Sequence, residues 1–155
     1  MPRRGESLIL VVDDDDLVRW SLGELLRDEG YRVVDARSGW EAVERCAKAD
    51  VALLDLRLGD IDGLALAEQI RKRRPGCAFV LVTAEDSPDL ERCARARGFS
   101  RVITKPFDAG TLLAHLGALL GAEDLRPASG AAPERSGPSR SSDDQAKAGP
   151  DPVRA

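Results

Sequence analysis

The sequence predicts an α/β protein built on a doubly wound parallel sheet of five strands, with five helices packed on its two faces. Three apolar runs, at 8–12, 51–54 and 78–82, lack the alternation of apolar and polar residues that a strand with one solvent-exposed face shows. Strands buried on both faces are therefore expected. Between the runs lie segments that carry a single apolar stripe at helical spacing. Strands and helices that alternate on short connections are typical of parallel sheets.

The segment after the first apolar run is expected to be a helix. It extends from about Leu17 to Asp28, and Gly30 would end it. Asp15 or Asp16 would be its N-cap, because a carboxylate at that position accepts hydrogen bonds from the free amides of the first turn. Its apolar stripe consists of Val18, Leu22, Leu25 and Leu26.

Two further strands are expected to enclose a second helix. A weaker strand pattern covers 31–36. Ser38 then opens a helix to about Lys48, with Glu41 at the spacing of a capping box. The strand that follows is apolar until its last residue, Asp55. A carboxylate at the carboxyl end of a buried strand either caps the next turn or takes part in the chemistry that open α/β folds place there.

The second half of the chain repeats this alternation, and turn and capping residues mark its boundaries. The elements expected are, in order, a helix over 64–74, a strand over 78–83, a helix from Ser87-Pro88 to about Arg97, a strand over 101–104 and a helix capped by Asp108. The helix after Ser87 is unusually polar, with Leu90, Cys93 and Ala94 as its main apolar positions.

Composition and charge narrow the class of protein. Charged residues make up 32% and hydrophobic residues 43% of the 155 residues, which is ordinary for one globular domain. The net charge is only −4, and no dense cluster of lysine and arginine indicates a nucleic-acid surface. The apolar runs are too short to span a membrane and the first residues lack an apolar signal core, so a cytoplasmic protein is expected.

The cysteines and the single histidine are interpreted as structural. Cys46, Cys77 and Cys93 have no metal-binding spacing and are expected to be small apolar fillers with reduced thiols. His115 has no neighbouring ligand at metal spacing and is interpreted as a helix-surface residue.

The character of the chain changes near residue 122. Residues 126–155 are rich in Pro, Gly, Ser and Ala, contain no aromatic residue, and include Val153 as their one β-branched aliphatic. Such a segment buries too little apolar surface to offset its ordering entropy. The sequence therefore predicts a folded domain at 6–121 and a disordered tail at 122–155.

Polar residues follow the expected strands at their carboxyl ends. Asp13 and Asp14 follow the first strand, Asp55 ends the third, Thr83 the fourth, and Lys105 follows the fifth. In a parallel sheet these ends share one edge, so three carboxylates should converge and repel one another. A divalent cation such as Mg²⁺ would relieve the repulsion, and an ammonium and a hydroxyl group suit a phosphoryl ligand. The residues therefore predict a metal-assisted phosphoryl site with a carboxylate acceptor.

Five short motifs give the chain a family resemblance. They are Val11-Val-Asp-Asp14, Leu53-Leu-Asp55, Asp62-Gly63, Val82-Thr-Ala84 and Lys105-Pro-Phe107. In this order and spacing they resemble the receiver domain of bacterial two-component response regulators, over about residues 6–121. The resemblance implies a flavodoxin-like fold with strand order 2-1-3-4-5.

The resemblance also implies a role for each site residue. Asp55 would accept a phosphoryl group from a sensor histidine kinase or a histidine phosphotransfer protein. Lys105 would contact the phosphoryl oxygens, and Thr83 would move toward them after transfer, which pulls the loop behind it. The implied Mg²⁺ ligands are Asp13, Asp14, Asp55 and the backbone carbonyl of Arg57. The readout would be the surface of the fourth helix, fifth strand and fifth helix.

Some positions depart from the family pattern. Leu58-Gly59 stands where a proline usually follows a hydrophobic residue, so a looser loop is expected. Val102 replaces the usual aromatic residue, and Phe99 is off that register, so a ring-flip readout is not expected. Arg57 and Glu85 should flank the pocket, either as an ion pair that shields it from water or as two solvated side chains.

The leading functional hypothesis is a stand-alone receiver, a switch with no external substrate turnover that binds partner proteins or relays phosphoryl groups. A DNA-binding regulator is one alternative, but the residues after the last helix show no helix-turn-helix pattern, so direct DNA binding is not expected. A phosphoesterase with an aspartyl-phosphate would usually have an acid/base aspartate where this chain has Arg57. A phosphorylation-independent adaptor and a phosphorylation-dependent homodimer stay open.

Overall fold

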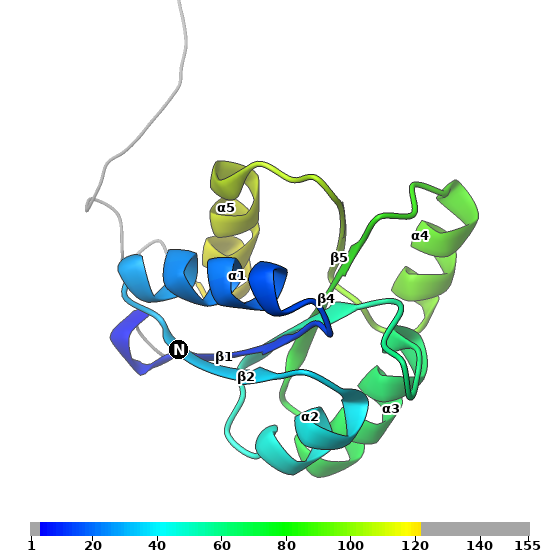
Figure 1. Ribbon diagram of the computed structural model, residues 1–155, viewed down its shortest axis with the longest axis horizontal. Coiled ribbons are helices and arrows are strands. Elements are labelled where there is room, and N and C mark those ends of the chain that lie inside the picture. Colours follow the sequence, from blue (N-terminus) through cyan, green and yellow to red (C-terminus); the bar gives the residue numbers. More distant parts are fainter. Residues whose placement is uncertain (1–3, 122–155) are drawn as a thin grey trace, which may run out of the picture. The chain divides into compact units, whose positions relative to one another are not determined.

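A computed structural model describes residues 4–121, and its centre is a single parallel sheet of five strands. The strands are β1 (Leu8–Val12), β2 (Arg32–Ala36), β3 (Val51–Asp55), β4 (Ala78–Thr83) and β5 (Arg101–Thr104). They pair in the order β2-β1-β3-β4-β5, so the predicted doubly wound sheet and its strand order are confirmed (Figure 1). In this order the carboxyl ends of β1, β3 and β4 are neighbours at one edge.

Five α-helices and one short 3₁₀ turn accompany the sheet within the described residues. They are η1 (Arg4–Glu6), α1 (Asp16–Asp28), α2 (Gly39–Arg45), α3 (Gly63–Arg73), α4 (Pro88–Ala96) and α5 (Ala109–Leu119). The expected helix to Lys48 is too long, because α2 ends at Arg45. Cys46 is its C-cap, and the Ala49 N–H donates to the Cys46 carbonyl in a turn that leads directly into β3.

Each α-helix begins at a polar N-cap, as helix ends with unpaired amides require. The capping side chains are those of Asp15, Ser38, Asp62, Ser87 and Asp108. Asp15 rather than Asp16 therefore caps α1. The predicted capping box at α2 is formed in part. Ser38 accepts a hydrogen bond from the Glu41 N–H at 3.1 Å, whereas the Glu41 carboxylate accepts from the Arg37 N–H rather than from Ser38.

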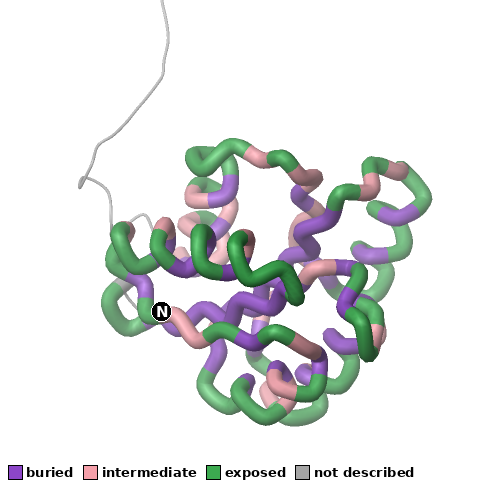
Figure 2. The backbone as a smooth tube through the Cα atoms, in the orientation of Figure 1, coloured by how far each residue is buried: buried purple, intermediate pink, exposed green. Residues whose placement is uncertain are grey.

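The core lies on both faces of the sheet, and the strands β1, β3 and β4 are deeply buried in it (Figure 2). Helices α1 and α5 cover one face, and α2, α3 and α4 contribute to the other. Successive residues of β3 alternate between them, since Leu53 belongs to the α1/α5 side and Leu54 to the opposite side. Both residues are almost fully buried, which explains the continuous apolar run at this strand.

One prediction about side-chain burial needs correction. Cys93 is exposed rather than a core filler, because α4 buries only the narrow face that carries Leu90 and Ala94. In α1 the predicted apolar stripe packs against the core, with Leu22 and Leu26 buried and Val18 and Leu25 half-buried. Cys46 and Cys77 are buried as predicted, and burial raises the pKa of the Cys77 thiol to about 12, so it stays protonated and unreactive.

Some predictions fall outside what the structure describes. The expected disordered tail at 122–155 lies beyond the described residues. Across residues 4–121, none of the helices combines the length and apolar character needed to cross a bilayer. His115 is half-buried on α5, where its Nδ1 accepts a hydrogen bond from Arg101 Nε at 3.2 Å.

Candidate functional site

Three carboxylates meet at the carboxyl edge of the sheet. Oxygen atoms of Asp13, Asp14 and Asp55 all lie within 4.8 Å of one another. Asp13 is buried beneath the site, Asp55 is half-buried, and Asp14 is exposed. The structure therefore brings together the acidic residues that the sequence predicted to converge.

Lys105 lies beside these carboxylates and provides a positive charge. Its Nζ is 2.9 Å from Asp13 Oδ2 and 3.8 Å from Asp55 Oδ1. The Lys105 backbone N–H donates to the Thr83 carbonyl at 2.7 Å, which fixes the end of β5 against the end of β4. The side chain thus reaches the acidic cluster from a neighbouring strand, as predicted.

Burial and negative neighbours raise the pKa of Asp55. Loss of solvent is the largest cause, followed by the charge of Asp13, with a smaller contribution from Asp14. The ammonium of Lys105 and the backbone amide of Arg57 oppose the rise without cancelling it. The site therefore retains more negative charge than its own cation neutralises. Three converging carboxylate oxygens at a half-open edge fit a hard divalent cation such as Mg²⁺.

Arg19 secures the β1–α1 connection and was missed by sequence reasoning. Its Nη1 donates to the Asp13 carbonyl at 2.7 Å, and its guanidinium also contacts Asp16 and Asp35. Arg19 is buried on the same helical face as Leu22. Its spacing of three residues from Leu22 was the available signal, because residues three apart on a helix share a face.

The β3–α3 loop, residues 56–62, is closely tied to its surroundings. The side chains of Leu56 and Leu58 are buried in the core. The Gly63 N–H donates to the Leu56 carbonyl at 2.7 Å, and a Cβ on Gly63 would lie 2.5 Å from the Asp55 carbonyl oxygen. Only glycine fits this close approach. The structure explains in this way why Gly63 follows Asp62 at the start of α3.

The β4–α4 loop, residues 84–87, is more exposed. Thr83, just before it, is buried, and its Oγ1 accepts a hydrogen bond from the Glu85 N–H at 3.1 Å. Arg57 Nη2 lies 2.9 Å from Glu85 Oε1, so the two side chains form an ion pair, and the shielding of the site from water stays a prediction. The Arg57 and Glu85 side chains are 79% and 40% exposed, which limits the energy of the pair.

Val102 stands where the family usually has an aromatic residue, and no nearby aromatic ring of the described residues takes the place of that residue. Val102 on β5 is half-buried and packs against the core on the α2/α3/α4 side. Phe99 is buried against Phe79, with ring centroids 5.7 Å apart, so its ring is part of the core. This arrangement agrees with the expectation that Phe99 does not substitute for an aromatic residue at Val102.

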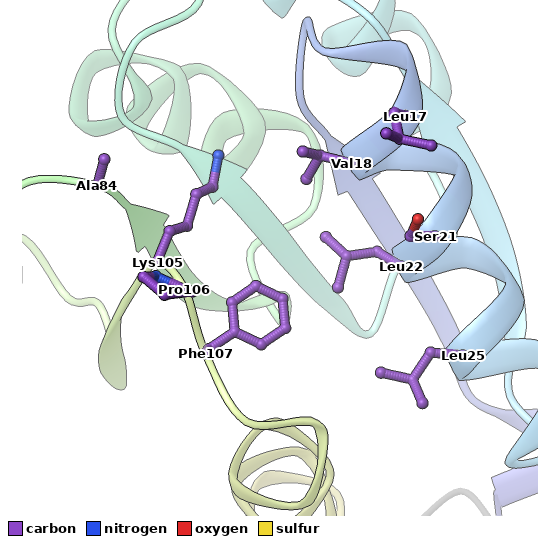
Figure 3. A pocket seen from close by; sticks show the side chains of 9 residues that line it. All are labelled: Leu17, Val18, Ser21, Leu22, Leu25, Ala84, Lys105, Pro106 and Phe107. Atoms are coloured by element: carbon purple, nitrogen blue, oxygen red, sulfur yellow. The ribbon is translucent and has the colours of Figure 1, made fainter.

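An apolar groove borders the site between α1 and the segment after β5 (Figure 3). Its volume is about 620 Å³, and Lys105 forms the end nearest the carboxylates. Side chains of α1 face Phe107 across the groove. The lining residues are Leu17, Val18, Ser21, Leu22, Leu25, Ala84, Lys105, Pro106 and Phe107. The lining residue Leu17 is 70% exposed, and Trp20, also on α1, is 62% exposed.

Comparison with known proteins agrees with this geometry. The response regulator receiver domain family matches residues 9–117, and the chain belongs to this family. A CheY-like response regulator receiver domain protein from Methanospirillum hungatei has a solved structure with 30% identity and a TM-score of 0.70. That match covers 77% of this chain and 97% of the other, so the similarity extends across the whole fold.

The curated relatives are longer than the matched region. The transcriptional regulatory protein PdtaR of Mycobacterium tuberculosis is 35% identical over 116 residues, which is 73% of this chain and 54% of PdtaR. A cyclic di-GMP phosphodiesterase of Thermotoga maritima is 35% identical over 99 residues, 63% of this chain and 27% of the relative. The chain thus spans about half or less of these relatives, whose names describe whole proteins.

Proposed function

We propose that this protein is a phosphorylation-driven switch in which Asp55 accepts a phosphoryl group. The observation that carries the proposal is the position of Asp55 within one cluster with Asp13, Asp14 and Lys105. These are the groups that phosphoryl transfer to a carboxylate needs: a nucleophile, ligands for a cation and a positively charged side chain.

Asp13, Asp14 and Asp55, with the backbone carbonyl of Arg57, are the proposed ligands of Mg²⁺. When bound, Mg²⁺ would neutralise charge on the carboxylates and on the phosphoryl oxygens. Asp13 is buried and its Oδ1 accepts a hydrogen bond from the Asp15 N–H at 2.9 Å, which orients its carboxylate toward the site. Lys105 is oriented by Asp13 and is close enough to Asp55 to meet a phosphoryl oxygen there.

In the proposed transfer, a carboxylate oxygen of Asp55 attacks the phosphorus of a phosphohistidine on a sensor histidine kinase or a histidine phosphotransfer protein. An O–P bond forms, the P–N bond breaks, and the imidazole nitrogen leaves with the electron pair and takes up a proton from solvent. The product is an acyl phosphate on Asp55, and its later hydrolysis by water returns the free carboxylate. No external substrate is turned over, so the protein is a switch rather than an enzyme.

The proposed response begins at Thr83. Its hydroxyl is buried next to the site and now accepts a hydrogen bond from Glu85. A phosphoryl group on Asp55 would offer this hydroxyl a strong acceptor, so Thr83 would turn toward it and draw the β4–α4 loop along. The readout is displacement of this loop and of α4, which is passed on to β5 and α5. It involves no ring flip, because Val102 stands where an aromatic residue would be needed for one. Chemical shifts that change only around Asp55 on phosphorylation, and not on α4, would refute this readout.

The proposed partners are the phosphoryl donor and a downstream protein, in the cytoplasm. The groove beside Lys105, whose lining residue Leu17 is largely exposed, offers an apolar surface next to the acceptor for the donor protein. Action as a single-domain receiver is part of the proposal. The alternative, a receiver joined to an output domain, is favoured by the greater length of PdtaR and of the phosphodiesterase.

The test is the intact mass of the full chain after incubation with acetyl phosphate, with and without Mg²⁺. Wild type is expected to gain one phosphoryl group only with Mg²⁺, and Asp55→Asn none. No gain in wild type would refute the switch and favour a phosphorylation-independent adaptor. A gain that persists in Asp55→Asn would refute the assignment of Asp55.

A further inference from the structure

The side chain of Asp60 joins the β3–α3 loop to a helix that precedes it by some twenty residues in sequence. Asp60 Oδ1 accepts a hydrogen bond from the Gly39 N–H and Oδ2 accepts one from the Trp40 N–H, each at 3.0 Å. Gly39 and Trp40 are the first two residues of α2. The hydrogen bond from Gly39 is the largest cause that lowers the pKa of Asp60; burial opposes it, and the hydrogen bond from Trp40 adds to the lowering, so the carboxylate is ionised at neutral pH.

The loop and the start of α2 are also in direct contact. A Cβ placed on Gly39 would lie 2.2 Å from Ile61 Cγ2 and 3.4 Å from both carboxylate oxygens of Asp60. Gly39 is buried, and a larger residue would have to displace the Ile61 side chain. The amino end of α2 and residues 60–61 are therefore interlocked through both hydrogen bonds and close packing.

Gly59 gives this contact its importance. Gly59 is exposed, and a Cβ built on it would have no heavy atom within 4 Å. Because glycine has no Cβ, the backbone at this position has more conformational freedom than another residue would allow, in a loop that connects Asp55 to helix α3 and carries the Arg57 carbonyl. Asp60 is the next residue along the chain, and its two hydrogen bonds fix the loop where glycine leaves it free.

We propose that Asp60 is a positioning residue of the acidic site. By holding the amino end of α2 it fixes the β3–α3 loop, and with it the Arg57 carbonyl, so that Mg²⁺ binds tightly although Gly59 occupies the turn. This inference rests on the proposed function, because it assigns the loop a role in holding the metal. It connects α2, on the rim of the sheet, to the phosphoryl chemistry at its centre.

The test compares Mg²⁺ affinity, measured by titration calorimetry on the full chain, between Asp60→Ala and a matched control. Ser38→Ala is that control, because Ser38 also caps α2, through the Glu41 N–H at 3.1 Å, without touching the loop. Loss of an outer partner of a metal ligand typically weakens binding by about 10–100-fold. We expect about tenfold weaker binding in Asp60→Ala and a change below about twofold in Ser38→Ala. Equal changes in both variants would overturn the inference.

A second control separates positioning from the loss of a negative charge. Asp86 is an exposed carboxylate on the neighbouring β4–α4 loop, and Asp86→Ala removes the same charge without releasing the β3–α3 loop. A loss of Mg²⁺ affinity in Asp86→Ala as large as that in Asp60→Ala would mean that charge alone accounts for the effect, and the positioning role would be wrong.

Hydrogen exchange on the metal-free protein tests the loop itself. Amides of residues 56–61 should exchange about tenfold faster in Asp60→Ala than in wild type, and at the wild-type rate in Ser38→Ala. If wild type binds Mg²⁺ and Asp60→Ala binds it equally well, the inference fails and the proposed function stands. If wild type neither binds Mg²⁺ nor accepts a phosphoryl group, the proposed function fails, and the metal-positioning role of Asp60 fails with it. Faster exchange in Asp60→Ala would then show only that Asp60 holds the loop.

Discussion

The two loops that flank the acceptor differ in how firmly they are held. The β3–α3 loop buries Leu56 and Leu58 and is linked to α2 through Asp60. The β4–α4 loop exposes Ala84 and contacts the first loop through the solvent-exposed pair of Arg57 and Glu85. The proposed switch would need this asymmetry, because the loop proposed to hold Mg²⁺ would have to keep its geometry while the loop proposed to signal would have to move.

The largest expected effect on the free energy of unfolding comes from the position where the β3–α3 loop meets α3. Gly63→Ala would place a Cβ 2.5 Å from the Asp55 carbonyl oxygen, which is backbone and has no freedom to turn aside. We expect a loss of about 2–4 kcal/mol in the free energy of unfolding, measured by urea denaturation. The control is Gly59→Ala, where the added methyl group meets nothing within 4 Å and should cost less than about 0.5 kcal/mol. Equal stability of the two variants would contradict the close packing at Gly63.

Truncating an apolar anchor of the firm loop should have the next largest effect. Leu58 is 5% exposed, and Leu58→Ala should lower the free energy of unfolding by about 2–3 kcal/mol, since it leaves a cavity under the loop. Asp86→Ala, on the exposed β4–α4 loop, should stay within about 0.5 kcal/mol of wild type. If thermal unfolding showed that both variants lose equally little stability, the two loops would not differ in how firmly they are held.

The acceptor between the loops should be a source of instability when no metal is bound. Because the pKa of Asp55 is raised, the native state binds its proton more tightly than the unfolded chain does, and the ionised form is disfavoured. Asp55→Asn should therefore raise the free energy of unfolding at neutral pH by about 0.5–2 kcal/mol. The advantage of the variant should grow as the pH rises from the ordinary carboxyl range through the raised pKa, and vanish below that range. Thermal melts in EDTA across this pH range measure it, and a pH-independent difference would contradict the electrostatic cause.

The sheet could be predicted from sequence because buried parallel strands produce continuous apolar runs, and Asp13, Asp55 and Lys105 follow from the rule that such strands share one carboxyl edge. Contacts between loops could not be predicted, since no spacing rule joins Asp60 to Gly39, and only the folded chain brings them together. The same holds for burial on α4, where Cys93 immediately precedes the buried Ala94 but lies outside the narrow face that the helix buries.

The smallest expected effect on stability comes from the contact between the two loops. Arg57→Ala removes the pair with Glu85, and because the Arg57 side chain lies largely in solvent the free energy of unfolding should change by less than about 0.5 kcal/mol. If the pair shields the acyl phosphate from water, the phosphoryl group should nevertheless hydrolyse several-fold faster in the variant, as followed by intact mass after removal of the donor. Glu85→Ala breaks the same pair from the other side and should accelerate hydrolysis to a similar extent. An unchanged lifetime in both variants would mean that the two side chains lie over the site without protecting it, whereas a change in Arg57→Ala alone would assign the effect to the guanidinium rather than to the pair.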